Sequence, residues 1–132
     1  MTKTQNTPQT KTLDLPIGRA VRHYLEGTQA LQHLLIDGQE AGIAAGSDWE
    51  VQALLEAWDE CRNVRGGGIR ISFNLETVED RAKATGALKV LREYVEHMTA
   101  PGFPDEFSAN ERRAGNKVLT AIMNANTVLR SL

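Results

Sequence analysis

The chain has 132 residues, of which 41% are hydrophobic and 24% are charged, a composition typical of globular proteins rather than disordered ones. Its formal net charge of −2 argues against a dedicated nucleic-acid binder, which usually carries a basic surplus. Aromatic residues make up only 5% of the chain, so the core has to rely on aliphatic side chains, as is common where helices pack on helices.

Residues 1–12 are polar and contain no apolar run, which predicts a mobile tail ahead of a single helical domain at 13–132. The tail lacks the apolar segment of a secretory signal, and no stretch approaches the roughly 18 apolar residues of a membrane-spanning helix. A lone Cys61 cannot form an internal disulfide. These features favour a protein of the cytoplasm, in a bacterium or in an infected host cell, with no membrane partner.

Apolar residues at 13, 15 and 17 alternate with polar ones, which predicts a short edge strand. Pro16 also suits the first turn of a helix, where its missing N–H is not needed. A helical stripe then runs from Ile17 to Leu35, and Gly38 supplies a stop after it. The stripe comprises Ala20, Val21, Tyr24, Leu25, Thr28, Leu31, Leu34 and Leu35.

A second helix is predicted from Ser47, because Glu50 stands three residues later in a capping-box pattern. It ends before the glycines at 66–68, which neither a helix nor a central strand tolerates well. Its predicted buried stripe comprises Val51, Leu54, Leu55, Trp58 and then Cys61 or Arg62.

A clean alternation of apolar and polar residues over 69–76 predicts a strand with one buried face. A lone strand leaves its backbone groups unpaired, so this one requires a mate. The residues around 12–15 are the only candidate within the chain, and the alternative is the same strand in a second copy.

Thr77 and Asp80 predict the start of a third helix, which runs to about Met98. Its predicted stripe comprises Val78, Ala82, Thr85, Leu88, Leu91, Val95 and Met98, widened by Ala84, Ala87 and Tyr94. Phe103 and Phe107, in and after a Pro-rich loop, are expected to plug the core. The fold class that follows is mainly α, a compact four-helix domain with one short central strand.

Ser108 and Glu111 form a third capping box, which opens the last helix. Its apolar positions alternate steps of four and three residues, a heptad-like spacing. They are Val118, Ile122, Ala125, Leu129 and Leu132. Two interpretations are open: the stripe closes the domain's own core, or it docks through Leu129 and Leu132 on a second copy or a larger protein.

Charge is unevenly spread along the chain, which predicts a bipolar surface suited to steering toward a charged partner. Every ionisable side chain from Asp37 to Glu60 is acidic, and basic residues follow directly. The candidate basic residues are Arg62, Arg65 and Arg70 around the glycines, with Arg112, Arg113 and Lys117 on the last helix. Glycine backbones flanked by arginines can bind an anion. The order helix, glycines, strand is the reverse of a phosphate loop, so a plain connector is the competing interpretation.

Few residues point to chemistry. His23 with Glu26, and Glu93 with His97, are each one helical turn apart, and the four would meet in a metal site if their helices packed together. Such pairs are also ordinary solvated contacts on helices. His33 has no partner pattern, and nothing local activates Cys61 as a nucleophile. No nucleotide-binding, metalloprotease or hydrolase motif is present, so we assign no catalytic residue, cofactor or metal.

The leading hypothesis is a non-enzymatic interaction protein, either a regulatory accessory protein or a small subunit of a larger assembly, which binds another protein or itself. Trp49, at a helix start in an acidic stretch, is a candidate interface anchor. One alternative is a nucleic-acid-associated subunit that uses the basic residues above, and another is an enzyme or metal protein with an unfamiliar site. No family signature is present, although in size and style the chain resembles small accessory proteins of phages and mobile elements.

Overall fold

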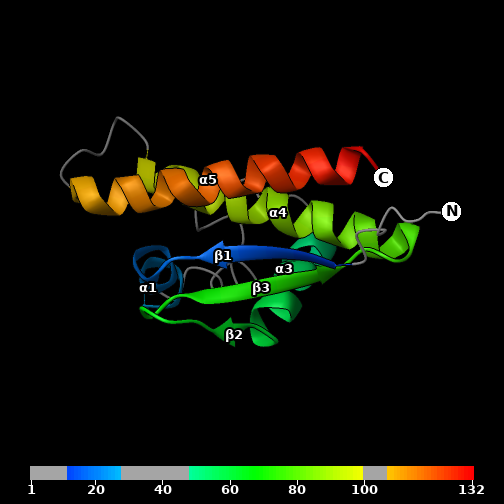
Figure 1. The fold of residues 1–132 in the computed structure, drawn as a ribbon, viewed down its shortest axis with the longest axis horizontal. Coiled ribbons are helices and arrows are strands. Elements are labelled where there is room, and N and C mark those ends of the chain that lie inside the picture. Colours follow the sequence, from blue (N-terminus) through cyan, green and yellow to red (C-terminus); the bar gives the residue numbers. More distant parts are fainter. Residues whose placement is uncertain (1–11, 28–47, 100–106) are drawn as a thin grey trace, which may run out of the picture.

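A computed structural model describes residues 12–27, 48–99 and 107–132 (Figure 1). In chain order the elements are β1 (Thr12–Ile17), α1 (Arg19–Gly27), α3 (Asp48–Asp59), β2 (Arg62–Asn63), β3 (Ile69–Asn74), α4 (Val78–Thr99) and α5 (Ala109–Arg130). The mainly helical class is confirmed, but the described residues form a small three-stranded sheet instead of one strand. The expectations for the tail, for residues 28–47 with their helix stop, and for Phe103 fall outside the described ranges.

The three strands form an antiparallel sheet in the order β1-β3-β2. The first strand pairs with β3 along its whole length, from Thr12 opposite Asn74 to Ile17 opposite Ile69. The mate that β3 requires is therefore the segment near the N-terminus of the same chain. The sequence did not predict β2, because two paired residues are too few to show any periodicity.

Pro16 and Ile17 belong to β1, so the prediction that the first helix begins there is wrong. Ile17 is fully buried as the third inward residue of the strand, which continues the alternation of Leu13 and Leu15. Pro16 occupies an outward position, and an edge strand tolerates its missing N–H. The helix begins only after Gly18.

One face of the sheet is buried and the other is exposed. The inward side chains are Leu13, Leu15 and Ile17 from β1 and Ile69, Ile71 and Phe73 from β3. Helix α3 lies behind the sheet in Figure 1, and α5 runs along β1. Each fully buried Leu, Ile or Phe side chain contributes about 1.5–3 kcal/mol, so this apolar layer is a large part of what holds β1 to the helices.

Helices α4 and α5 run antiparallel and pack closely (Figure 1). Gly115 permits the approach, because a Cβ there would lie 3.1 Å from Thr99 Cγ2 and 3.3 Å from Met98 Cβ. The inward face of α5 is Val118, Ile122 and Ala125, all buried. The last helix therefore closes this chain's own core.

The predicted stripe of α4 is wrong in its first half. Val78 is 75% exposed, and Ala82 and Thr85 also face solvent. The buried side of the helix is formed by Ala84, Gly86, Ala87, Leu88, Val90, Leu91, Tyr94, Val95 and Met98. Small residues take the inward positions of the first turns because α3 crosses there. A Cβ on Gly86 would lie 2.8 Å from both Glu50 Cγ and Trp49 Cζ3.

The predicted starts of the last two helices are confirmed. The Asp80 amide donates to Thr77 Oγ1 over 2.9 Å at the start of α4, and Ser108 with Glu111 forms a complete capping box on α5. Helix α3 ends at Asp59, earlier than predicted, because Arg62 and Asn63 join the sheet. Within the described ranges, no helix is both long enough and apolar enough to cross a membrane.

Candidate functional site

The turn between β2 and β3 packs tightly against the junction of β1 and α1. Gly66 and Gly67 have φ of 90° and 89°, a conformation that side chains rarely adopt. A Cβ on Gly68 would lie only 2.6 Å from the Ile17 carbonyl oxygen and 3.3 Å from Gly18 Cα. Of the three glycines that the sequence left as either an anion site or a connector, Gly68 is thus required for a close backbone crossing, and Gly66 and Gly67 for the left-handed turn beside it.

A hydrogen-bonded network holds this turn to the helices. Arg22 Nη1 donates to Asn63 Oδ1 over 3.0 Å and to the Gly67 carbonyl over 3.3 Å, while its Nε pairs with Glu26 Oε1 at 2.9 Å. Trp58 Nε1 donates to the other Glu26 oxygen over 2.7 Å. Arg22 and Glu26 therefore serve as structural links between α1, α3 and the β2–β3 turn.

The start of α5 is fixed beside α1. The capping hydrogen bonds from the Ser108 backbone and side chain lower the pKa of Glu111, and the charge of the nearby His23 on α1 adds to this effect. Tyr24 meets Phe107 edge to face, with ring centroids 5.2 Å apart. The first turns of α5 are thereby held against the first helix.

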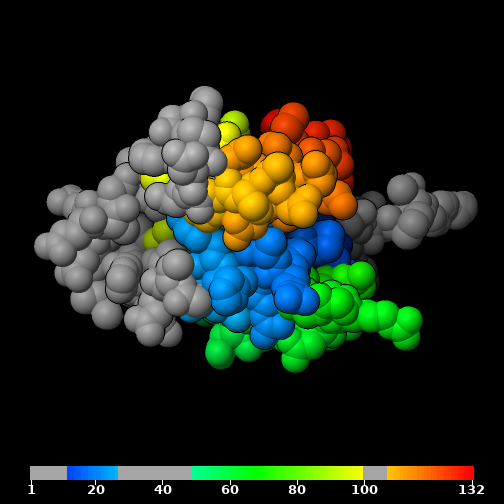
Figure 2. Space-filling model, turned by 90° about the vertical axis from the view of Figure 1, so that its left-hand side faces the viewer, coloured from blue at the N-terminus to red at the C-terminus, as the bar shows by residue number. Residues whose placement is uncertain are grey.

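These contacts gather six cations at one end of the molecule, which we call the basic end: Arg19, Arg62, Arg65, Arg70, Arg113 and Lys117. All six side chains are exposed. Figure 2 views this end and shows the start of α5 in orange, β1 and α1 in blue, and the β2–β3 hairpin in green, next to one another. The six residues come from three segments that are far apart in sequence.

Two hollows line the basic end. One, of about 430 Å³, lies between the β1–α1 junction and α5, where Gly18, Asn110, Arg113 and Lys117 border it. The other, of about 440 Å³, is bordered by Arg19, Arg22, His23, Glu26 and Gly67. Gly18 and Arg19 are consecutive residues, so the two hollows are neighbours at the start of α1.

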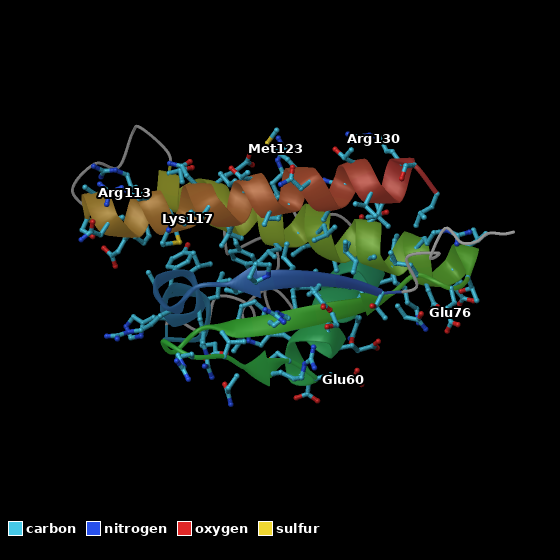
Figure 3. All side chains as sticks on the ribbon, in the orientation of Figure 1. Glu60, Glu76, Arg113, Lys117, Met123 and Arg130 are labelled. Atoms are coloured by element: carbon cyan, nitrogen blue, oxygen red, sulfur yellow. The ribbon has the colours of Figure 1, made fainter. Side chains whose placement is uncertain are left out.

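The six cations of the basic end form no ion pair within the described residues. Arg113 donates to Asn110 Oδ1, and none of the six cations takes part in any of the ion pairs found there, which are Arg22–Glu26, Lys89–Glu50 and Arg92–Glu96. Glu26 is already engaged by Arg22 and Trp58. Figure 3 shows Arg113 and Lys117 at one end of the molecule and the acidic Glu76 at the other. Within the part of the chain that the structure describes, these six charges are therefore not neutralised by a direct ion pair.

Two of the six cations oppose each other directly. Arg62 on β2 is the cross-strand partner of Arg70 on β3, and Pro16 flanks Arg70 on the other side. Like charges opposite each other destabilise an antiparallel pair by a few tenths of a kcal/mol to about 1 kcal/mol. A bound anion would relieve that repulsion.

The partner-binding residues predicted from the sequence do not all lie at the basic end. Arg112 donates to the Phe107 carbonyl over 2.7 Å and supports the start of α5, so it does not belong to the basic end. Leu129 packs against the core, whereas Leu132 is 45% exposed. Trp49 is 51% exposed at the start of α3. Sequence reasoning missed Arg19 and Arg22, because only the tertiary fold brings α1 to the glycine turn.

The alternative metal site gains no support from the geometry. Glu26 is held by Arg22 and Trp58, and the described residues contain no group of three or more potential metal ligands. Glu93 instead has a buried Oε2 with no hydrogen-bond partner, and burial raises its pKa. Cys61, two residues beyond the end of α3, is a half-buried free thiol, and His33 lies outside the described residues.

Comparisons with known protein families, with curated proteins and with solved structures found no significant match.

Proposed function

We propose that this chain is a non-enzymatic interaction module, an accessory protein or small subunit that docks an acidic partner through the basic end. One observation supports the proposal most. Six exposed cations from α1, α5 and the β2–β3 hairpin share one end of the molecule, and none has an ion-pair partner in the described ranges. A folded protein gains nothing in stability from such a concentration of charge, so an external partner is the simplest reason for it.

Retention on immobilised heparin, a dense polyanion, tests the proposal. The chain carries a formal net charge of −2, so an average over the whole surface predicts no retention. We expect retention at low ionic strength, because the cations are concentrated at one end.

Two matched variants distinguish the effect of where the cations lie from the effect of net charge. The basic-end variant combines Arg65→Gln, Arg113→Gln and Lys117→Gln. The control combines Arg92→Gln, Arg130→Gln and Lys83→Gln, which are exposed cations elsewhere on the surface. Both remove two arginines and one lysine. Loss of retention in the first variant alone supports the proposal, whereas equal loss in both, or no retention of the wild type, contradicts it.

A further inference from the structure

We infer that the acidic partner is a nucleic-acid duplex, whose phosphates the basic end contacts without reading the bases. This inference rests on the proposed function and names its ligand. It depends on three properties of the basic end: the type of cation, the arrangement of the hollows, and the lack of an exposed aromatic ring among its described residues.

The cations are mainly of the type that recognises phosphate. Arginine supplies five of the six, and its planar guanidinium donates two parallel hydrogen bonds to one phosphate or carboxylate. Asn110 adds a neutral amide at the rim of the α5 hollow, beside Arg113 and Lys117. A mixture of arginines with amide groups is typical of surfaces that position a protein on a phosphate backbone.

The arrangement suits a chain of anions better than a single ion. Arg113 and Lys117 border one hollow, while Arg19 borders the neighbouring one at the start of α1. Arg19 also packs over Gly67, since a Cβ there would lie 2.9 Å from Arg19 Cδ, and this contact continues the positive surface onto the turn that carries Arg65. A regularly spaced row of phosphates can engage several of these points at once.

In the described ranges no exposed aromatic ring lies at the basic end, which favours a duplex. Single-strand binders stack bases on exposed aromatic rings, and protein interfaces are usually anchored by buried aromatic residues. The large hydrophobic side chains exposed in the described ranges are Trp49, Val64, Val78, Met123 and Leu132. Only Val64 belongs to the basic end's hairpin, and Trp49 packs on α4. Tyr24 is near this end but packs its ring against Phe107. The basic end therefore offers contacts to phosphates, which a duplex presents without any unstacking of its bases.

Fluorescence anisotropy with three labelled probes tests the inference: a random-sequence DNA duplex, one of its separated strands, and a polyglutamate peptide. We expect the duplex to bind most tightly. Each phosphate contact on B-DNA contributes about −0.9 to the slope of log K against log salt, so six cations predict a slope of up to about −5. The basic-end variant should have about half that slope, while the control variant keeps the wild-type value. Circular dichroism melts confirm that both variants are folded.

The outcomes distinguish the two proposals. Tight duplex binding that the basic-end variant alone weakens supports both. Binding of polyglutamate without the duplex, lost in the same variant, upholds the proposed function and overturns the inference. Tighter binding of the single strand than of the duplex also overturns the inference, because it requires contacts to unstacked bases. Absence of binding to all three probes, together with no retention on heparin, overturns both.

Discussion

Replacing Gly68 with alanine should damage the corner on which the basic end is built. The added Cβ would lie 2.6 Å from the Ile17 carbonyl oxygen, 3.3 Å from Gly18 Cα and 3.5 Å from the Arg19 amide nitrogen. All three atoms are backbone, so no side chain can rotate away, and β1 has to separate from the turn. Overpacking of this kind costs about 1–3 kcal/mol, and rigid neighbours place Gly68→Ala at the upper end of that range.

Two neighbouring glycines provide matched controls for this prediction. Gly66 has φ of 90° but no atom within 4 Å of the point where a Cβ would lie, and Gly18 has open space without a positive φ. In each of the three variants, alanine lowers the entropy of the unfolded chain, which by itself adds about 0.4–1 kcal/mol to the free energy of unfolding. Left-handed strain adds about 1–2 kcal/mol at Gly66. The expected net changes are therefore a loss of about 2 kcal/mol for Gly68→Ala, about 1 kcal/mol for Gly66→Ala, and a small gain for Gly18→Ala.

Urea unfolding followed by circular dichroism measures these three free energies directly. We expect the order Gly18→Ala, Gly66→Ala, Gly68→Ala from most to least stable, with the same denaturant slope throughout. Gly68→Ala should also weaken retention on heparin, because it moves the turn away from Arg19. Wild-type stability in Gly68→Ala would refute the close contact between Gly68 and the Ile17 carbonyl. Equal losses of stability at all three positions would refute the argument that a steric clash at Gly68 costs more than backbone strain at Gly66.

Three further predictions concern the links around the core. Glu93→Gln should stabilise the protein at neutral pH, because burial raises the pKa of Glu93. The stability that the protonated Glu93 contributes is fully present below pH 4.5 and is lost as the pH rises through the raised pKa. Urea unfolding at several pH values should show a difference in unfolding free energy between variant and wild type that widens with pH, and a difference independent of pH would contradict the burial argument. Trp58→Phe removes the 2.7 Å hydrogen bond to the Glu26 carboxylate and should lower the free energy of unfolding by about 1.5–3 kcal/mol, but by much less when Glu26 is already alanine. In a double-mutant cycle, equal losses in both backgrounds would rule out this hydrogen bond as a stabilising link. Ser108→Ala removes the first capping interaction of α5 and should lower the free energy of unfolding by about 1 kcal/mol, measured by thermal or urea unfolding. Ser108→Thr retains the hydroxyl and should lose much less.

The parts of the fold that depend on local sequence were predictable. Capping at Thr77 and Ser108 is a matter of three or four consecutive residues, and the structure contains both interactions. The alternation at 69–75 likewise predicted β3, because an exposed and a buried face impose a period of two. The choice between two mates for β3 was open in the sequence, since pairing energy depends on chain geometry rather than on either strand alone.

The parts that depend on packing were not predictable. The inward face of α4 includes Gly86 because α3 crosses there, whereas apolarity alone selected the exposed Val78. Arg112 had the same appearance in sequence as Arg113, yet it bonds to the Phe107 carbonyl. Arg19 lies on a helix without any motif and joins the candidate site only because Gly68 contacts the end of β1.

The pairing of β1 with β3 has a consequence for how the chain reaches its native state. Asp14 and Ser72 are 58 positions apart and bond across the two strands, so β1 leaves the ribosome long before its mate has been made. The β2–β3 hairpin and the α4–α5 pair, in contrast, join segments that follow each other closely. We expect these local units to form early and the N-terminal strand to dock late, which would make its insertion the slow step of folding.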